Sequence, residues 1–442
     1  MRSRVRRIAI SGLVALATVL GGVAIPATAM AQPTSGVRST GAVAARAASP
    51  ARAAAGGGIF GGVPKISCVS TTDCLAVEGT SSLSENGSAV PTRVARWNGK
   101  SWKSVAVALP KGTKSADLEA VSCKSATSCL VVGDYYKSAS SSAPNYPLAL
   151  VYNGTALKPT TAVPVPKGAT DVTLADVSCA TTRYCVAIAS ALPAPGINES
   201  NSGPDILIET WNGAKWTLRT IATSVKSEVQ PSAVSCATAA FCVLAGGLTT
   251  LSGSDNFSFG LYLGLWNGKT LTRMKAPAEG GANSAAEPAG VSCAAPSNCG
   301  VTGIVLGNVT SGSNAPDITA FTQVWNGKTW LAGKVALPKG SQSIILGVSC
   351  HGANSCETVG EGATSATATS GHALAVSYKG VAGVVQAVPA PAKGRSTAFT
   401  DVSCLPGGTC VATGWTGKSN AATPSLMTGV WGGKSWKLGP GF

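Results

Sequence analysis

Fourteen cysteines carry the spacing in this chain that most directly indicates chemistry. They form seven Cys-x5-Cys pairs, and successive pairs start 54 to 57 residues apart. Paired cysteines at fixed spacing are typical of disulfides in an oxidising compartment. A zinc site usually needs four ligands and Cys-x2-Cys spacing, whereas each pair here offers two. We therefore expect these disulfides: Cys68–Cys74, Cys123–Cys129, Cys179–Cys185, Cys236–Cys242, Cys293–Cys299, Cys350–Cys356 and Cys404–Cys410.

The sequence has two histidines for acid–base or metal chemistry, His351 and His372. His351 lies inside a Cys-x5-Cys segment, and His372 follows a long loop of the same repeat. We expect both side chains to be solvent-exposed at opposite ends of the fold, where they cannot form a dyad or share a metal. No cysteine remains as a nucleophile, and no Gly-x-Ser-x-Gly elbow, phosphate loop or EF-hand loop occurs. The sequence therefore predicts neither a cofactor nor a metal site.

Carboxylates and aromatic side chains gather in one set of long loops, those that follow the second strand signal of each repeat. Two carboxylates about 5 to 10 Å apart in a cleft would suit a polysaccharide hydrolase or lyase, although no motif surrounds these acids. Aromatic rings beside carboxylates are also typical of sugar or peptide sites, and we expect Tyr135 and Tyr136 to be exposed. The candidate ligand-binding residues are Asp134, Tyr135, Tyr136, Tyr146, Asp205, Asp255, Phe257, Glu361 and Trp415.

Four strand signals in each repeat, A to D, must position these residues. Strand A ends in Val-Ser-Cys or Ile-Ser-Cys, and strand B follows the partner cysteine. Strand C ends in an aromatic residue, usually followed by Asn-Gly, which predicts a type I′ hairpin into strand D. The serine before each first cysteine fits a crowded inner strand and can bond a neighbouring backbone group. The pattern predicts an all-β, seven-bladed β-propeller of four-stranded antiparallel blades, with one disulfide per blade.

The two ends of such a propeller should differ in charge. Fifteen of the 19 acids fall in the B–C and D–A loops and the starts of the A strands. The opposite end holds the A–B loops and C–D turns and is basic. Its cations are Lys100, Lys124, Arg183, Lys215, Lys269, Lys328, Lys379 and Lys434, against Asp73 and Glu357. This asymmetry predicts that the basic end binds an anionic polymer, with the acidic and aromatic loops turned towards a partner.

The N-terminal segment reads as an export signal. Arginines precede the apolar run of residues 8–25, and Ala29-Met30-Ala31 fits a cleavage site, so residues 1–31 are predicted to be a signal peptide. Residues 32–57 lack large apolar side chains and are predicted to be a disordered tether. The propeller is expected to occupy residues 58–442. The formal net charge is +15, but these two N-terminal segments hold seven arginines and no acid, which leaves the repeats near +8. That charge permits anionic partners without indicating nucleic acid.

The Val-Ser-Cys-x5-Cys and Trp-Asn-Gly-x-x-Trp repeats resemble those of secreted actinobacterial seven-repeat β-propeller proteins, over about residues 60–442. The resemblance implies the fold and export, and the family carries no agreed activity. The Trp-Asn-Gly turn is also weakly similar to the Asp-box of sialidase-type propellers. In Ala95-Arg96-Trp97-Asn98-Gly99, however, the aspartate of that box is missing. The sequence therefore does not support a sialidase.

The function indicated by the sequence is non-catalytic binding by a secreted propeller, extracellular or associated with the cell wall. The expected partners are an envelope glycan or a protein, with anionic wall polymer on the basic end. We expect a monomer with no membrane span after signal cleavage. The alternatives are an extracellular polysaccharide hydrolase or lyase that uses loop carboxylates, and a purely structural wall protein.

Overall fold

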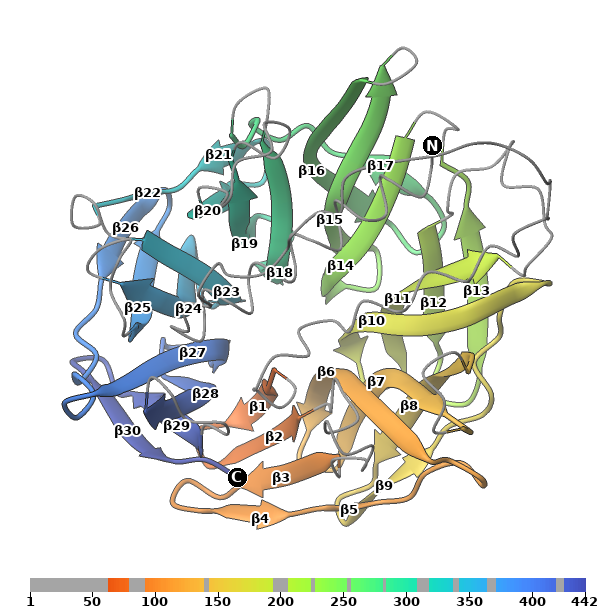
Figure 1. Cartoon of the computed structure of the whole chain (residues 1–442), viewed down its shortest axis with the longest axis horizontal. Coiled ribbons are helices and arrows are strands. Elements are labelled where there is room, and N and C mark those ends of the chain that lie inside the picture. The colour runs from red at the N-terminus through yellow and green to blue at the C-terminus, as the bar shows by residue number, and fades with distance from the viewer. Residues whose placement is uncertain are drawn as a thin grey trace, which may run out of the picture.

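The computed structural model describes residues 63–78, 92–138, 143–193, 206–223, 227–252, 256–280, 284–307, 318–336, 342–363, 371–418 and 425–442. These parts are all-β and form seven blades arranged in a ring (Figure 1). Within them, no helix is long and apolar enough to cross a bilayer. The predicted signal peptide and tether lie outside the described residues and stay predictions.

Each blade contains four antiparallel strands in the order A-B-C-D, with strand A nearest the axis (Figure 1). The A strands are β1 (Lys65–Ser70), β6 (Ser115–Ser125), β10 (Ala169–Thr181), β14 (Ser227–Thr238), β18 (Ala285–Ala295), β23 (Gln342–Cys350) and β27 (Arg395–Cys404). The B strands are β2 (Asp73–Glu78), β7 (Ser128–Tyr136), β11 (Tyr184–Pro193), β15 (Phe241–Ser252), β19 (Asn298–Leu306), β24 (Ser355–Ala363) and β28 (Cys410–Lys418).

The outer half of each blade carries the aromatic residues. The C strands are β3 (Arg93–Trp97), β8 (Asn145–Tyr152), β12 (Ile206–Trp211), β16 (Asn256–Trp266), β20 (Ile318–Trp325), β25 (His372–Lys379) and β29 (Ser425–Trp431). The D strands are β4 (Trp102–Ser104), β9 (Ala156–Pro159), β13 (Trp216–Ile221), β17 (Leu271–Arg273), β21 (Trp330–Ala332), β26 (Ala382–Val385) and β30 (Trp436–Pro440). Two short strands, β5 (Ala106–Val107) and β22 (Lys334–Val335), pair in parallel with β9 and β26.

A closed ring of side-chain hydrogen bonds joins the inner strands. The serine before each first cysteine accepts the backbone N–H of the equivalent cysteine in the next blade, at 2.8 to 2.9 Å. The bonds run from Cys123 to Ser67, Cys179 to Ser122, Cys236 to Ser178, Cys293 to Ser235, Cys350 to Ser292, Cys404 to Ser349 and Cys68 to Ser403. The predicted role of these serines is confirmed, and the Ser403 bond closes the ring between blades 7 and 1.

The A–B hairpins explain a recurrent glycine in strand B. A register shift in strand A, as between Leu118 and Ala120, turns a backbone carbonyl towards strand B. A Cβ on Gly133 would lie 1.9 Å from the carbonyl oxygen of Asp117, so no larger residue fits. Four other blades repeat this close approach, at Gly246, Gly303, Gly360 and Gly414. All seven predicted disulfides are formed at the turn end of these hairpins.

The C–D connections differ from the predicted type I′ hairpins. Trp97 pairs directly with Trp102, so four residues rather than two form the loop. Gly99 has a φ of 90°, whereas Asn98 is not among the residues with positive φ. Instead, Asn98 Oδ1 accepts the backbone N–H groups of Lys100 at 2.9 Å and Ser101 at 2.8 Å. The asparagine side chain thus shapes a longer loop, as in an Asx turn.

The two ends of the ring are formed by different connections between strands. The turn face is formed by the seven A–B loops, 69–73, 124–128, 180–184, 237–241, 294–298, 351–355 and 405–409, and the C–D turns that follow the strand-C aromatics. The loop face is the opposite end, formed by the B–C and D–A connections. All of the undescribed internal segments belong to these connections, so the turn face is the end that the structure describes fully.

Replacing Ser403 with alanine should lower the free energy of unfolding by about 1 kcal/mol, because one intramolecular hydrogen bond to Cys68 is lost. The matched variant Ser235→Ala removes the equivalent bond to Cys293 inside the ring. If the serine bond contributes equally at every blade junction, the free energy of unfolding should fall by the same amount in the two variants. Denaturant unfolding under oxidising conditions measures this. A several-fold larger loss in Ser403→Ala would show that ring closure depends on this bond more than other junctions do.

Candidate functional site

The predicted loop-face residues do not gather into one described site. Asp134, Tyr136, Glu361 and Trp415 are buried, with at most 7% of their surface exposed. Tyr136 is thus enclosed, contrary to the expectation of exposure. Asp205 and Asp255, together with the side chain of Phe257, lie outside the described residues. Their part in a ligand site therefore stays a prediction.

Tyr135 and Tyr146 do lie together, near the loop end of blade 2. They are opposite each other on β7 and β8, and their ring centroids are 5.3 Å apart. The Lys137 ammonium lies 4.5 Å from the Tyr146 ring centroid, within the range of a cation–π contact. Both tyrosines are half-buried and Lys137 is exposed, so this cluster presents a small aromatic and cationic surface on the loop face.

Asp134 has a structural setting between blades 2 and 3. Its carboxylate accepts a hydrogen bond from the Asn145 side-chain amide, which also donates to Thr173 of blade 3 at 2.7 Å. The Asn145 backbone N–H donates to Asp171 at 3.2 Å. These bonds link two blades, so they account for a buried aspartate without catalysis.

Other carboxyl groups are buried inside the blades and their junctions. Glu209 is 1% exposed, and Glu357 and Glu361 are also buried. Loss of hydration raises the pKa of each of the three to about 8, and that of the half-buried Glu287 to about 7. Near neutral pH, most of these groups are therefore protonated, and the folded chain is more positive than its formal charge.

The histidines lie at opposite ends, as predicted, but both are half-buried rather than exposed. His351 lies in the A–B loop of blade 6, where one ring nitrogen and the sulfurs of Cys404 and Cys410 all lie within 4.8 Å of one another. Those sulfurs form a disulfide, and a metal site needs thiolates. His372 begins β25 at the loop end. The described geometry therefore shows no use of either histidine as a metal ligand or base.

The turn face presents an array of exposed cations with little opposing charge. Its loops and turns contain one acid, Asp73, which forms an ion pair with Arg96 at 2.6 Å. The nearby Glu357 is buried, and its raised pKa keeps it largely uncharged at pH 7. The eight predicted turn-face cations are all exposed: Lys100, Lys124, Arg183, Lys215, Lys269, Lys328, Lys379 and Lys434.

A cavity of about 200 Å³ opens between the A–B loops of blades 2 and 3. Lys124 and Ser128 line it from blade 2, and Thr181, Thr182 and Trp211 line it from blade 3. The Cys179–Cys185 disulfide and the blade 2 strand residues form the apolar part of the wall. No carboxylate belongs to this lining, and partial loss of hydration lowers the pKa of the Lys124 ammonium.

Sequence inspection missed this cavity because its lining comes from two repeats. Ser128 immediately precedes the second cysteine of its pair, where three other repeats have the larger residues Tyr184, Phe241 and Asn298. The serine alone was no signal for a cavity, because blade 6 has Ser355 at the same position. What it borders could not be known before the facing blades were placed.

No protein-family model matches the chain, and no curated protein is similar to it. Solved propellers show a distant likeness. An α-L-arabinanase of Penicillium chrysogenum has 12% identity and a TM-score of 0.41, over 72% of this chain and 92% of its own. The fucose-specific lectin of Aleuria aurantia has 10% identity and a TM-score of 0.39, over 74% and 95%. The sialidase of Trypanosoma rangeli has 12% identity and a TM-score of 0.43, over 69% and 53%. Likeness at this level carries no inference about ligand or activity.

The buried glutamates predict how stability depends on pH. Glu209 keeps its proton up to about pH 8 in the folded chain, while in the unfolded chain it ionises near pH 4.5. Between these values the folded chain binds more protons, so the free energy of unfolding should fall as pH rises. The slope reaches at most about 1.4 kcal/mol per pH unit for each such group. Denaturant unfolding between about pH 5 and 8 measures it.

The variant Glu209→Gln keeps an uncharged side chain of similar shape, so it should flatten this pH dependence. Glu119→Gln is the matched control, because Glu119 is exposed. Equal slopes for wild type and Glu209→Gln would show that Glu209 ionises alike in both states.

Proposed function

We propose that this protein is an exported, non-catalytic binding propeller whose turn face attaches to an anionic polymer of the cell envelope. The observation that most supports this proposal is the array of eight exposed cations on the turn face. The two nearby acids add little negative charge, because Asp73 is paired with Arg96 and the raised pKa of Glu357 keeps it largely protonated. Seven disulfides support an oxidising location for the mature chain. In this proposal, the loop face is turned outward to a glycan or protein partner.

The lysine positions favour contact with an extended polymer over a single small ligand. Lys100, Lys269 and Lys328 each follow the glycine of an Asn-Gly turn in a different blade. The backbone N–H of each donates to the turn asparagine at 2.9 Å, which fixes the base of every side chain. The cations are therefore presented from separate blades around one face, where a polyanion can contact several at once.

The described carboxyl groups do not favour the hydrolase or lyase alternative. A carboxylate pair acts on a substrate in a cleft, whereas Asp134 and Glu361 are buried, and no carboxyl group lines the described cavity. The Tyr135–Tyr146 pair and Lys137 support binding at the loop face instead, since ring faces and a cation can contact a glycan or a peptide.

Replacing four turn lysines with glutamine should weaken binding to an anionic polymer by at least about tenfold, since several charge contacts are lost together. The variant changes Lys100, Lys269, Lys328 and Lys434. Binding to immobilised polyphosphate or polygalacturonate is measured at low and at physiological ionic strength. Affinity should fall with salt as the Debye length shortens to about 8 Å.

The control variant removes four exposed lysines from the D–A connections of the loop face, Lys111, Lys114, Lys167 and Lys393. It has the same net charge as the turn-face variant. If the turn face is the attachment surface, this control should bind nearly as tightly as wild type. Equal losses in the two variants would mean that binding follows net charge alone, which would contradict the proposal.

A further inference from the structure

A small side chain, Ser128, borders the cavity between blades 2 and 3. Ser128 pairs across the A–B loop with Ser125, as Tyr184 pairs with Thr181 in blade 3. At the junction of blades 3 and 4, Tyr184 extends towards the next blade and its hydroxyl accepts the indole N–H of Trp266 at 3.3 Å. The hydroxymethyl group of Ser128 is too short to fill the same space at the junction of blades 2 and 3.

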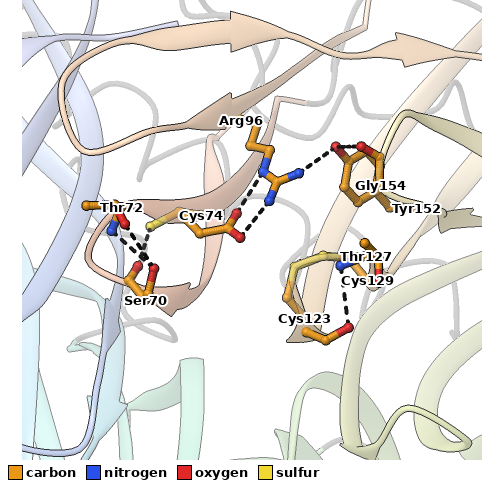
Figure 2. Close-up of polar contacts among 11 residues, drawn as sticks. Ser70, Thr72, Cys74, Arg96, Cys123, Thr127, Cys129, Tyr152 and Gly154 are labelled. Atoms are coloured by element: carbon orange, nitrogen blue, oxygen red, sulfur yellow. Dashed lines mark hydrogen bonds and ion pairs between the residues drawn. A yellow bond between two sulfur atoms is a disulfide. The ribbon is translucent and has the colours of Figure 1, made fainter.

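Other junctions of the turn face are filled in different ways. Between blades 1 and 2, Arg96 bonds Asp73 and donates to the Tyr152 hydroxyl at 3.2 Å, so its guanidinium bridges the gap (Figure 2). Between blades 4 and 5, Phe241 packs against the hydrophobic cluster that these two blades share. Between blades 5 and 6, Asn298 donates to the carbonyl of Gly352 at 2.8 Å.

The indole N–H of Trp211 differs from those of three equivalent tryptophans, which donate to protein groups. The indole N–H of Trp97 donates to Thr71 at 3.1 Å, that of Trp325 donates to Pro296 at 2.9 Å, and that of Trp266 donates to Tyr184. Trp211 is 7% exposed and lines the cavity, and within the described residues its N–H has no hydrogen-bond partner. This N–H is accessible from the cavity rather than fully buried, so a ligand acceptor can take the place of water there.

The remaining polar lining suits an anion. The Lys124 ammonium and the hydroxyls of Ser128, Thr181 and Thr182 can all donate hydrogen bonds, and no acid opposes them. Arg183 adds a second cation at the rim, where its side chain packs against Gly213 of the lining. A volume of about 200 Å³ holds roughly seven waters at about 30 Å³ each, enough for a monosaccharide.

We propose that this cavity binds one acidic sugar unit, whose carboxylate or phosphate group is held by Lys124 and the indole N–H of Trp211. This inference deepens the proposed binding of an anionic polymer, because it assigns to the turn face a site that selects one unit of the chain. The hydroxyls of Ser128, Thr181 and Thr182 hold the sugar, and the disulfide side of the cavity contacts its apolar edge.

The test uses nuclear magnetic resonance to record the indole N–H signals of protein labelled with 15N-tryptophan. The variant Trp211→Phe identifies the Trp211 signal by its loss. D-glucuronate is the carboxylate probe, glucose 6-phosphate the phosphate probe, and glucose the neutral control. The Trp211 signal should shift and saturate with one or both acids in the millimolar range, and not with glucose. An unmoved signal, or an equal shift with glucose, would overturn the proposal.

Two variants test separately whether binding requires the Lys124 ammonium and whether it requires the open cavity. Lys124→Gln keeps the cavity and should weaken the acid affinity at least about tenfold, the effect of one charge-assisted hydrogen bond. Ser128→Tyr should abolish the acid-dependent shift without loss of stability, because Tyr184 at the equivalent position of the next blade occupies its junction and accepts the indole N–H of Trp266. The control variant Lys111→Gln, on the loop face, keeps both the Lys124 ammonium and the cavity. It should bind the acids like wild type.

The outcomes distinguish this site from the polymer proposal. If polyphosphate and polygalacturonate fail to bind but the Trp211 signal still responds to an acid, the cavity proposal stands and the polymer proposal fails. If both polymers bind and the signal does not respond, only the lysine array acts. Unchanged affinity in Lys124→Gln would remove the ammonium from the site and overturn the assignment.

Discussion

The close approach of the inner strands is the constraint on which the rest of the structure depends. A serine hydroxyl can accept the next blade's cysteine N–H at 2.8 to 2.9 Å only if the A strands lie nearly in contact around the axis. Small residues are therefore required beside each first cysteine. The bulge in strand A and the glycine opposite it, such as Gly133, meet the same requirement within a blade. The disulfide then fixes the A–B hairpin at the register that the serine bond needs.

The candidate site arises because the side chains that fill the junctions between blades differ from one junction to the next. The serine ring and the disulfides place equivalent residues at equivalent points of every junction, so one changed side chain alters one junction and leaves the ring intact. The hydroxyl of Tyr184 accepts the indole N–H of Trp266 at one junction, whereas a cavity lies between Ser128 and Trp211 at the junction before it. A fold held together by its inner strands can therefore acquire a site on its turn face with little cost in stability.

Periodicity made the fold predictable, since it reports local chemistry that recurs in every repeat. The blade number, the disulfides and the bonding role of the inner serines follow from residues near each other in sequence. The Asn-Gly connection was misjudged because the dipeptide does not reveal that Trp97 and Trp102 pair outside a four-residue loop. The cavity lining could not be inferred, because it combines residues of two adjacent blades. The burial of Tyr136 and Glu209 was not predicted either, since their positions in strands B and C do not by themselves specify burial.

The two turn-face features differ in the physics of binding, and that difference gives them separate roles. Exposed lysines act through long-range, salt-screened attraction, which speeds encounter and holds many anions alike. The cavity places a charge and an indole donor beside apolar walls, where an unmatched group loses its hydration without gaining a partner. Attraction by the array therefore raises the local concentration of a polymer, and desolvation at the Lys124–Trp211 cavity discriminates among its units. Because Asn-Gly loops and disulfides already fix the backbone on this face, binding orders side chains and ligand but not the protein chain.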